Sequence, residues 1–423
     1  MKPTLTCTCG SVAPGDVWSC PRRGLDDREH VLRLPLCERW LVDDAEQNPF
    51  LRYRQMLFVY HEATAAGLSD QQFVELVGTL DEQVWSVDGR RFLVTPTAEV
   101  ASLGHDVGAR VWLKDETGSV SGSHKARHVA GLMVGLLARE TAGLLDTRPQ
   151  LAIASCGNAA LAAAVVAAAA QWPIAVFVPP DGDPFTLNRL EQLGADVRRC
   201  PRDGAPGDPT YRAFQAAVAD GAIPFGCQGP DNGRTIDGGR TMGWELAEQV
   251  GELDRVIVHV GGAALASGVF QGLAGAVAGG RLSSLPVFDT VQTEGCAPLA
   301  RALHHTRSLG GIDEAARNRS AVMWPWETTP HSIASGILDD ETYDWYGAVE
   351  AMLTTGGDAI IVTDEVVAEA NELVRSHTTM TPSFTGSAGV AGLLAHTRAG
   401  RLETDDRVAV LITGIDRAAE EQQ

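Results

Sequence analysis

SGSHKAR, residues 121–127, places Lys125 between an apparent strand at 111–114 and an apolar helical pattern at 129–137. Small neighbours let a flat ligand approach the backbone closely. A partly desolvated lysine amine loses its proton readily and can form a Schiff base. An exposed lysine in a surface loop is the alternative, because most lysines are solvated. The segment is therefore a candidate site that needs support from elsewhere in the chain.

A second segment, ASCGNA at 154–159, follows the apolar run 151–153 and opens an alanine-rich stretch at 159–170. The pattern predicts a strand, a tight loop and a buried helix. Helix N-termini carry unpaired N–H groups and suit an anion such as a carboxylate. Asn158 has two open interpretations, a ligand-binding residue or a helix N-cap. The candidate substrate-binding residues are Ser155, Cys156, Gly157, Asn158 and Ala159.

A third segment, VIVHVGGAALASG at 256–268, also predicts a strand, a loop of small residues and a helix. Such a loop presents backbone N–H groups to a phosphate, although a strand-to-helix turn without a ligand looks similar. The candidate phosphate-binding residues are Gly261, Gly262, Ala263, Ala264 and Leu265. A further apolar strand at 407–414 ends in Thr413 and a glycine.

Strands and helices alternate through the middle of the chain. The predicted strands are 151–155, 174–179, 196–200 and 223–227, and the predicted helices between them are 159–170, 184–193 and 211–220. This alternation is typical of an α/β fold with an open, mostly parallel sheet flanked by helices. Ligands of such sheets bind beyond the carboxyl ends of the strands. The three motif loops follow strands, so we expect them to converge.

Taken in order, these motifs resemble the fold-type-II pyridoxal-phosphate enzymes, the tryptophan synthase β superfamily. Two more segments are similar to the threonine synthase branch: NPFLRYR at 48–54 and DGGRTMGWE at 237–245. The resemblance covers roughly residues 45–416. It implies a two-lobed fold, with a large cofactor domain at 45–126 and 240–423, a small domain at 127–239 and a ribbon-like segment at 1–44. A homodimer is implied by the resemblance only.

The resemblance also implies roles for the motif residues. Lys125 would hold pyridoxal 5′-phosphate as a Schiff base and remove the Cα proton of an amino-acid substrate. The loop 261–265 would bind the phosphate, with a further hydrogen bond from His124. Thr413 would meet the pyridine nitrogen, and Asn158 would reach the 3′-oxygen. A neutral partner for the ring nitrogen favours elimination and replacement.

Three functions remain open. The first is elimination or replacement of the threonine synthase type, for which Arg52 and Arg54 mildly favour an anionic leaving group, although both fit surface salt bridges equally well. The second is a serine/threonine ammonia-lyase. The third is a non-catalytic paralogue, which the intact Lys125 disfavours. Cys156 stands where relatives usually have a second hydroxyl residue, and Ala263 and Ala264 stand where they often have glycine.

Composition fits a globular enzyme. The chain has 423 residues, 44% of them hydrophobic, and a formal net charge of −20. This charge disfavours nonspecific nucleic-acid binding and anionic membrane surfaces. No apolar run is long enough to span a bilayer, so we expect a cytoplasmic protein. Four cysteines near the start, Cys7, Cys9, Cys20 and Cys37, lack the Cys-x-x-Cys spacing of a zinc knuckle. We therefore expect a degenerate ribbon and no metal.

Overall fold

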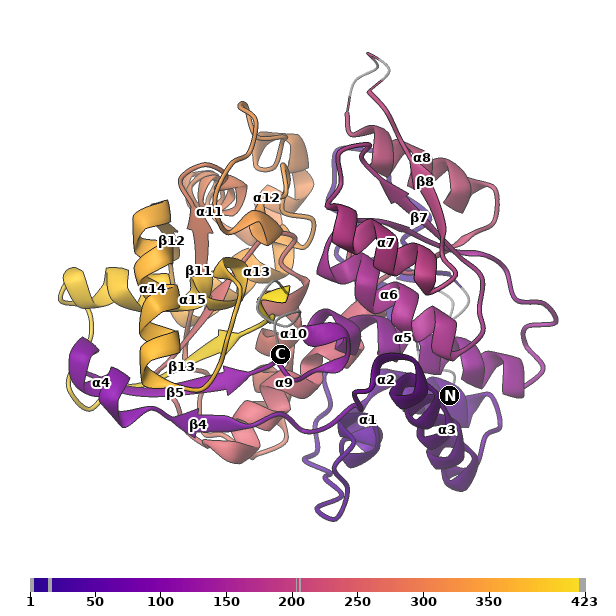
Figure 1. Cartoon of the computed structure of the whole chain (residues 1–423), viewed down its shortest axis with the longest axis horizontal. Helices are drawn as coiled ribbons and strands as arrows, with labels where there is room; N and C mark the ends of the chain where they lie inside the picture. Colours follow the sequence, from indigo (N-terminus) through magenta and orange to yellow (C-terminus); the bar gives the residue numbers. More distant parts are fainter. Residues whose placement is uncertain (1–3, 14–16, 203, 205–206, 418–423) are drawn as a thin grey trace.

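A six-stranded sheet forms the larger of two lobes in the computed structural model, which describes residues 4–13, 17–202, 204 and 207–417 (Figure 1). The strand order is β12-β11-β10-β13-β5-β4, and β4 alone runs antiparallel to its neighbour. The strands are β4 (Thr97–Glu99), β5 (Arg110–Asp115), β10 (Arg255–His259), β11 (Val287–Thr293), β12 (Ala359–Val362) and β13 (Arg407–Ile412).

Both faces of this sheet are covered by helices, as expected for parallel strands. Along β13, Val408 and Val410 pack with the helices of one face, whereas Ala409 and Leu411 pack with those of the other. This alternation follows from the two-residue period of a strand. One face carries α4 (Ala101–Val107), α14 (Asp364–His377) and α15 (Phe384–Arg398). The other carries α9 (Thr235–Gln249), α10 (Ala264–Ala278), α11 (Pro298–Leu309), α12 (Ile312–Arg317) and α13 (Trp345–Thr355).

A four-stranded parallel sheet, in the order β8-β7-β6-β9, forms the core of the second lobe. Its elements are β6 (Leu151–Ala154), α6 (Asn158–Ala169), β7 (Ile174–Val178), α7 (Pro184–Gln192), β8 (Asp196–Arg199), α8 (Pro209–Ala219) and β9 (Ile223–Pro224). The predicted βα alternation and the α/β fold class are confirmed. The strand predicted at 223–227 is shorter than expected, since β9 ends at Pro224, although the Phe225 N–H still donates to the Ala152 carbonyl of β6 at 2.8 Å.

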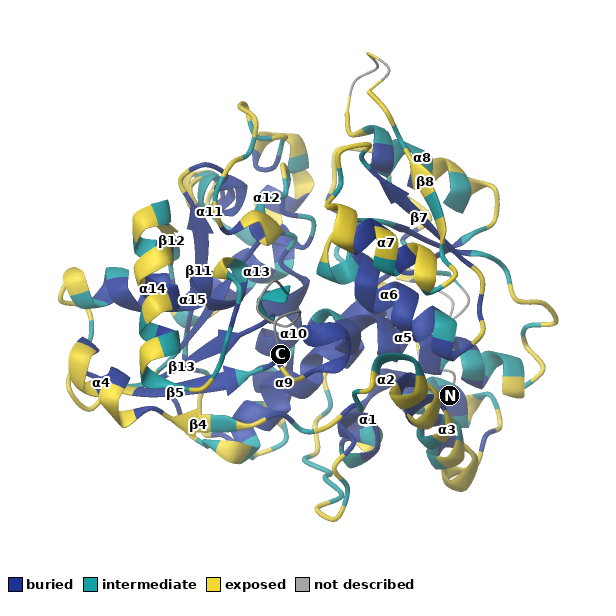
Figure 2. Ribbon diagram, viewed as in Figure 1, coloured by how far each residue is buried: buried dark blue, intermediate teal, exposed yellow. Residues whose placement is uncertain are grey.

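Helix α5 (Lys125–Thr141) runs between the lobes and is buried along most of its length (Figure 2). The amino-terminal helices α1 (Pro49–Arg52), α2 (Phe58–Ala65) and α3 (Asp70–Asp88) share one hydrophobic cluster with α5 and α6. This packing favours grouping residues 49–88 with the smaller lobe instead of the larger one. The domain boundaries inferred from sequence stay a prediction.

The first described residues form a three-stranded antiparallel sheet, β2-β1-β3. Its strands are β1 (Leu5–Cys7), β2 (Val12–Ala13) and β3 (Leu32–Arg33). The expectation of a degenerate ribbon without a metal stays a prediction, but Cys7, Cys9 and Cys20 converge with His30 in the structure. Sequence reasoning counted cysteines and missed the histidine, which chain folding brings next to them.

None of the helices in the described ranges has the length and apolarity needed to cross a membrane.

Candidate active site

One cavity of about 370 Å³ collects the motif loops where their strands end. It is lined by every residue that the sequence analysis assigned to cofactor or substrate binding: His124, Lys125, Ser155, Cys156, Gly157, Asn158, Ala159, Gly261, Gly262, Ala263, Ala264, Leu265 and Thr413. The N-termini of α6 and α10 are among the helix N-termini that reach this cavity. The convergence follows from the parallel strands, whose carboxyl ends meet at one edge of each sheet. The binding roles of the individual residues stay predictions.

Lys125 is the first residue of α5 and follows a tightly turned segment. Ser121 and Gly122 both have positive φ, at 56° and 70°, and a serine rarely adopts such a conformation. Its backbone is held from two sides, because the Ser121 N–H donates to Asp88 at 2.8 Å and the Ser121 carbonyl accepts from Arg417 at 2.7 Å. In the described part of the chain, the Lys125 amine forms no hydrogen bond or ion pair, so it is available for chemistry in the cavity.

Buried neutral histidines surround this amine. Burial, reinforced by the charge of Lys125, lowers the pKa of His259 to about 3 and that of His124 well below its ordinary value. The His124 Nδ1–H donates to the Thr413 carbonyl at 3.2 Å, which leaves Nε2 as an acceptor. A neutral ring in this tautomer has no proton to give to a phosphate oxygen. The geometry therefore disfavours the phosphate contact expected of His124.

Thr413 lies at the end of β13 and forms a hydrogen bond with His259, 2.9 Å from Oγ1 to Nε2. If the histidine donates, the threonine hydroxyl keeps its own proton for a further acceptor, as a pyridine nitrogen requires. The other ring nitrogen of His259 is buried without a partner among the described residues, and so is Nε2 of His124. Buried polar atoms normally form hydrogen bonds. The two unpartnered ring nitrogens are therefore consistent with a cavity that binds a polar ligand.

The loop at 261–265 has the geometry of a phosphate cradle at the start of α10. Ala263 adopts the left-handed conformation, with φ 70°, and α10 begins at the next residue with no acidic side chain in its first turn. The two glycines allow a close approach, because a Cβ at Gly261 would lie 2.5 Å from Asp339 and one at Gly262 would lie 3.2 Å from Tyr343. These features fit the phosphate of a cofactor.

Asp339 is the residue of this cavity that sequence reasoning missed and that bears most on ligand binding. Burial raises the pKa of its carboxyl group to about 6, against the lowering effect of Lys125, and the Gly262 backbone N–H donates to it. A phosphate at the cradle competes with this carboxylate, so cofactor binding is expected to displace or protonate Asp339. The segment 335–343 carries no motif, and no signal in the sequence indicates its position.

The substrate-loop segment forms the turn between β6 and α6. Helix α6 begins at Asn158 and its N-cap is Gly157, so the interpretation of Asn158 as a cap is wrong. The Asn158 side chain instead accepts a hydrogen bond from Arg417 at 2.7 Å. Sequence reasoning missed Arg417, which follows the last strand and fixes the orientation of the amide.

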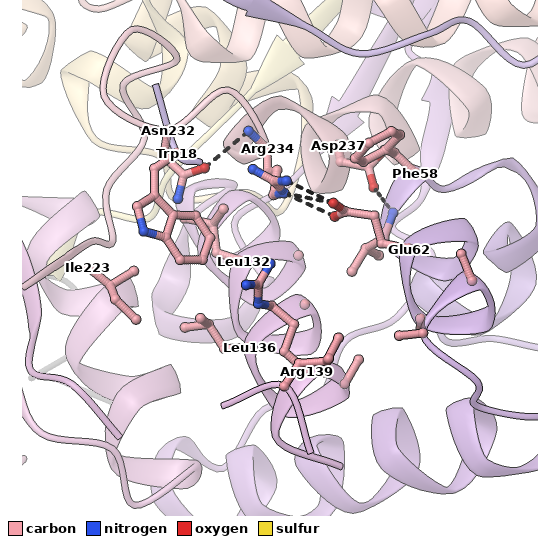
Figure 3. A pocket seen from close by; sticks show the side chains of 18 of the residues that line it. Trp18, Phe58, Glu62, Leu132, Leu136, Arg139, Ile223, Asn232, Arg234 and Asp237 are labelled. Carbon is pink, nitrogen blue, oxygen red and sulfur yellow. Dashed lines mark hydrogen bonds and ion pairs between the residues drawn. The ribbon is translucent and has the colours of Figure 1, made fainter. Parts of the chain in front are cut away.

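A larger cavity, of about 570 Å³, lies against α2 and α5 without reaching Lys125 (Figure 3). Its charged groups are already engaged. Arg234 pairs with Glu62 at 2.8 Å, and Asp237 accepts from the backbone N–H groups of Phe58 and Val59. Size alone therefore does not identify the reactive site, and the smaller cavity holds the available nucleophile.

Comparisons with known proteins agree with this geometry. A family model described as "Pyridoxal-phosphate dependent enzyme" matches residues 91–414. The chain is 25% identical to threonine synthase from Methanocaldococcus jannaschii over 332 residues, which cover 76% of this chain and 74% of the relative. It is 29% identical to a serine dehydratase-like protein from Mus musculus over 200 residues, 46% of this chain and 56% of the relative. Maize serine racemase has a similar fold, with a TM-score of 0.62 and 18% identity, covering 82% of this chain and 95% of the other.

Proposed function

The chain belongs to the pyridoxal-phosphate-dependent enzyme family, and from that premise we propose that it catalyses elimination, with or without subsequent replacement, on a small amino-acid substrate. The observation that carries the proposal is the amine of Lys125, unpaired among the described residues, in a cavity that it shares with the N-termini of α6 and α10. One N-terminus suits the cofactor phosphate and the other suits the substrate carboxylate.

The residues present fit the cofactor. Backbone N–H groups at the start of α10 would hold the phosphate, Thr413 would face the ring nitrogen, and Lys125 would hold the aldehyde carbon. When bound, pyridoxal 5′-phosphate supplies an electron sink for negative charge at the substrate Cα. Lys125 then lies in the right cavity to take the Cα proton as a general base. Because Thr413 and His259 are both uncharged, the ring nitrogen has no ionised partner, which supports elimination chemistry.

The charges around the cavity favour an uncharged leaving group. Among the described residues, Lys125 is the one lysine or arginine that lines the cavity. Two acidic residues, Asp208 and Asp339, line it as well. The two arginines considered for an anionic leaving group are engaged elsewhere, since Arg52 pairs with Glu248 and Arg54 with Asp70. A hydroxyl group, released as in a serine or threonine ammonia-lyase, suits this cavity better than a phosphate.

A reaction of the threonine synthase type is the second candidate. It is favoured by the threonine synthase from M. jannaschii, whose match extends over about three quarters of both chains. The dehydratase-like relative matches less than half of this chain.

The two reactions differ in their products, so one set of assays separates them. The purified holoenzyme is incubated with serine, threonine, O-phosphoserine and O-phosphohomoserine, and keto acid and phosphate are measured separately. Keto acid from the unphosphorylated substrates is the expected result. Phosphate release without keto acid would instead support the second candidate.

Lys125→Ala is the control for both reactions. It is expected to lower the rate by about 10³-fold or more, because it removes the general base as well as the covalent anchor. A variant as active as the parent protein would refute the proposal. A parent protein that binds no cofactor and yields neither product would show a non-catalytic paralogue.

A further inference from the structure

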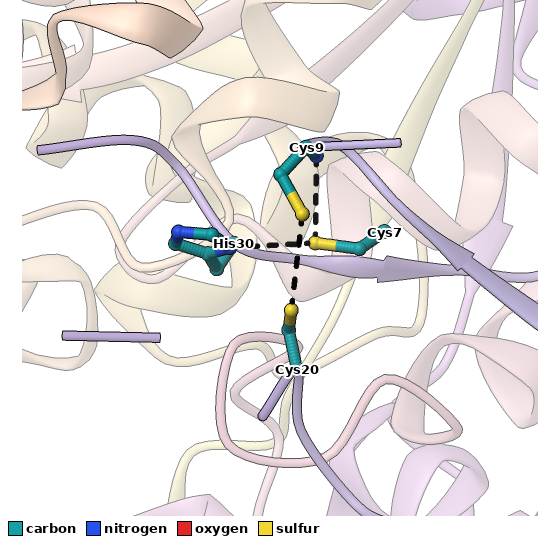
Figure 4. Close-up of side chains that lie close together, drawn as sticks. All are labelled: Cys7, Cys9, Cys20 and His30. Atoms are coloured by element: carbon teal, nitrogen blue, oxygen red, sulfur yellow. Dashed lines mark hydrogen bonds between the residues drawn. The ribbon is translucent and has the colours of Figure 1, made fainter. Parts of the chain in front are cut away.

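Four side chains near the amino terminus form a compact cluster and are not among the residues that line the cavity of Lys125. The ligand atoms of Cys7, Cys9, Cys20 and His30 all lie within 4.8 Å of one another (Figure 4). The Sγ atoms of Cys9 and Cys20 are 3.9 Å apart, and Sγ of Cys7 lies 3.7 Å from Nδ1 of His30. Around a tetrahedral zinc ion, two thiolates would be roughly 3.8 Å apart and a thiolate and an imidazole roughly 3.6 Å. These two distances in the cluster are close to the expected values, and the other pairs of ligand atoms lie within 4.8 Å.

The surroundings orient the four groups toward a common centre. The His30 Nε2–H donates to Asp26 at 2.8 Å, which leaves the Nδ1 lone pair facing the cysteines. A carboxylate on the distal nitrogen is the usual partner of a metal-binding histidine. The Cys9 backbone N–H points to Sγ of Cys7 at 3.5 Å, and Gly10, with φ 85°, closes the turn that brings the two sulfurs together.

Burial supports a structural role for the cluster. Cys7, Cys20 and His30 are each at most 3% exposed. Among the described cysteines, none is disulfide-bonded, and a separation of 3.9 Å is well beyond the roughly 2.05 Å of an S–S bond. The remaining amino-terminal cysteine, Cys37, lies outside the cluster and donates to the Arg39 carbonyl.

We propose that Cys7, Cys9, Cys20 and His30 bind a structural Zn²⁺ ion that fastens the amino-terminal segment across both lobes. Three thiolates and one imidazole in a closed, tetrahedral arrangement form a donor set that selects zinc. The sequence hides this site because Cys-Thr-Cys-Gly replaces the usual two-residue gap and because the fourth ligand is a histidine.

The loop between the ligands Cys20 and His30 contacts both lobes. On the small-sheet side, Arg23 pairs with Asp231 and donates to the Tyr211 hydroxyl at 3.0 Å. On the other side, the carboxylate of Glu29 accepts from the indole of Trp345. Metal binding at the two ends of this loop therefore fixes contacts to elements that are distant in the sequence.

These contacts reach the wall of the catalytic cavity. The ring of Tyr211 lies 5.8 Å from that of Tyr343, centre to centre, and Tyr343 lines the cavity that holds Lys125. Arg23 is tied directly to the metal site, because its N–H donates to the Cys20 carbonyl at 3.0 Å. Loss of the metal should therefore loosen residues 208–231 as well as the ribbon.

The test measures metal in the full-length protein purified without chelators. Inductively coupled plasma mass spectrometry should find about one zinc per chain. Cys20→Ser should lose it, whereas Cys37→Ser, the matched control, should retain it. Asp26→Asn keeps all four ligands and should lower zinc affinity about ten-fold, so the proposal stays testable if Cys20→Ser does not fold.

Hydrogen exchange tests the connection to the cavity without any activity assay. Removal of zinc should speed exchange in peptides from 208–231 and leave β13 unchanged. Three results for the parent protein would overturn the site. These are free thiols without zinc, a Cys9–Cys20 disulfide, and a metal other than zinc. Unchanged exchange in 208–231 would overturn the connection. None of these outcomes depends on the proposed catalytic function.

Discussion

Ala263 is a residue under backbone strain at the start of α10. Its φ of 70° is in the left-handed region, which costs an L-residue about 1–2 kcal/mol relative to glycine. The next residue, Ala264, is also buried but has helical geometry. The cradle is therefore built with an alanine at the position where glycine would be easier to accommodate.

A glycine scan of this pair isolates the strain. Ala263→Gly and Ala264→Gly each delete one buried methyl group, but only the first relieves a left-handed alanine, and the second weakens a helix. Ala263→Gly should therefore destabilise the protein by about 1–2 kcal/mol less than Ala264→Gly. Denaturant unfolding of the two variants measures this difference. Equal losses of stability would show that Ala263 is not strained.

Buried histidines near Lys125 predict acid sensitivity. Burial lowers the pKa of His128 to about 3, from an ordinary value of 6.5. The unfolded chain therefore binds more protons between these values, so stability is present above pH 6.5 and is lost as the pH falls toward 3.

An asparagine at position 128 can keep the hydrogen bond to the Thr235 carbonyl, which His128 makes at 2.8 Å, without titrating. Between pH 6.5 and 5, the free energy of unfolding should fall less steeply for His128→Asn than for the parent protein. The difference between the two slopes should be about 1.4 kcal/mol per pH unit. The same substitution at the exposed His105 is the control. Parallel curves for His128→Asn and the parent protein would refute the assignment.

At the scale of elements, α9 and α10 pack so closely that glycines replace side chains between them. A Cβ at Gly272 would lie 2.3 Å from the Arg240 carbonyl oxygen and 2.9 Å from Cα of Gly243. Backbone atoms inside a helix cannot give way as a flexible side chain can. The small residues of DGGRTMGWE, residues 237–245, are thus explained by helix packing.

Gly272→Ala should destabilise the protein by about 1–3 kcal/mol, because overpacking outweighs the better helix propensity of alanine. Gly78 in α3 is the matched control, since a Cβ there meets no atom within 4 Å. Gly78→Ala should stabilise the protein by about 0.5–1 kcal/mol. Thermal or denaturant unfolding gives both values. Stabilisation by both substitutions would mean that α9 and α10 are further apart than the structure places them.

At the scale of the whole molecule, a buried ionic cluster joins the lobes. Lys114 from β5 and Arg127 from α5 both contact Glu245 of α9, and Arg127 also contacts Glu116 at 2.9 Å. All four residues are nearly inaccessible to solvent. Burial alone would raise the pKa of Glu245, but Arg127 and Lys114 outweigh it and lower that pKa.

Glu245→Gln should destabilise the protein by about 3–5 kcal/mol, because it leaves buried positive charge without its partner. The exposed pair of Glu99 and Arg110 serves as the control, and Glu99→Gln should cost less than about 1 kcal/mol. Chemical denaturation at pH 7 compares the two. A loss below about 1 kcal/mol for Glu245→Gln would show that water reaches the cluster.

Local sequence patterns were enough to predict the α/β class, the order of strands and helices, the family and the motif residues that line the cavity. These follow from local patterns: the period of strands and helices, the loops of small residues and the chemistry of single side chains such as Lys125. Parallel strands then bring the loops together without further information.

Contacts between segments that no local pattern links could be assigned from the folded chain alone. Asp339 over Gly262, Arg417 on Asn158 and His30 among the cysteines are each brought to their partners by chain folding. The tautomer of His124 and the engagement of Arg52 likewise depend on neighbours distant in the sequence. Spacing along the sequence reports local geometry. The charge state of a side chain, the position of its proton and the coordination of a metal depend instead on distances between residues in the folded structure.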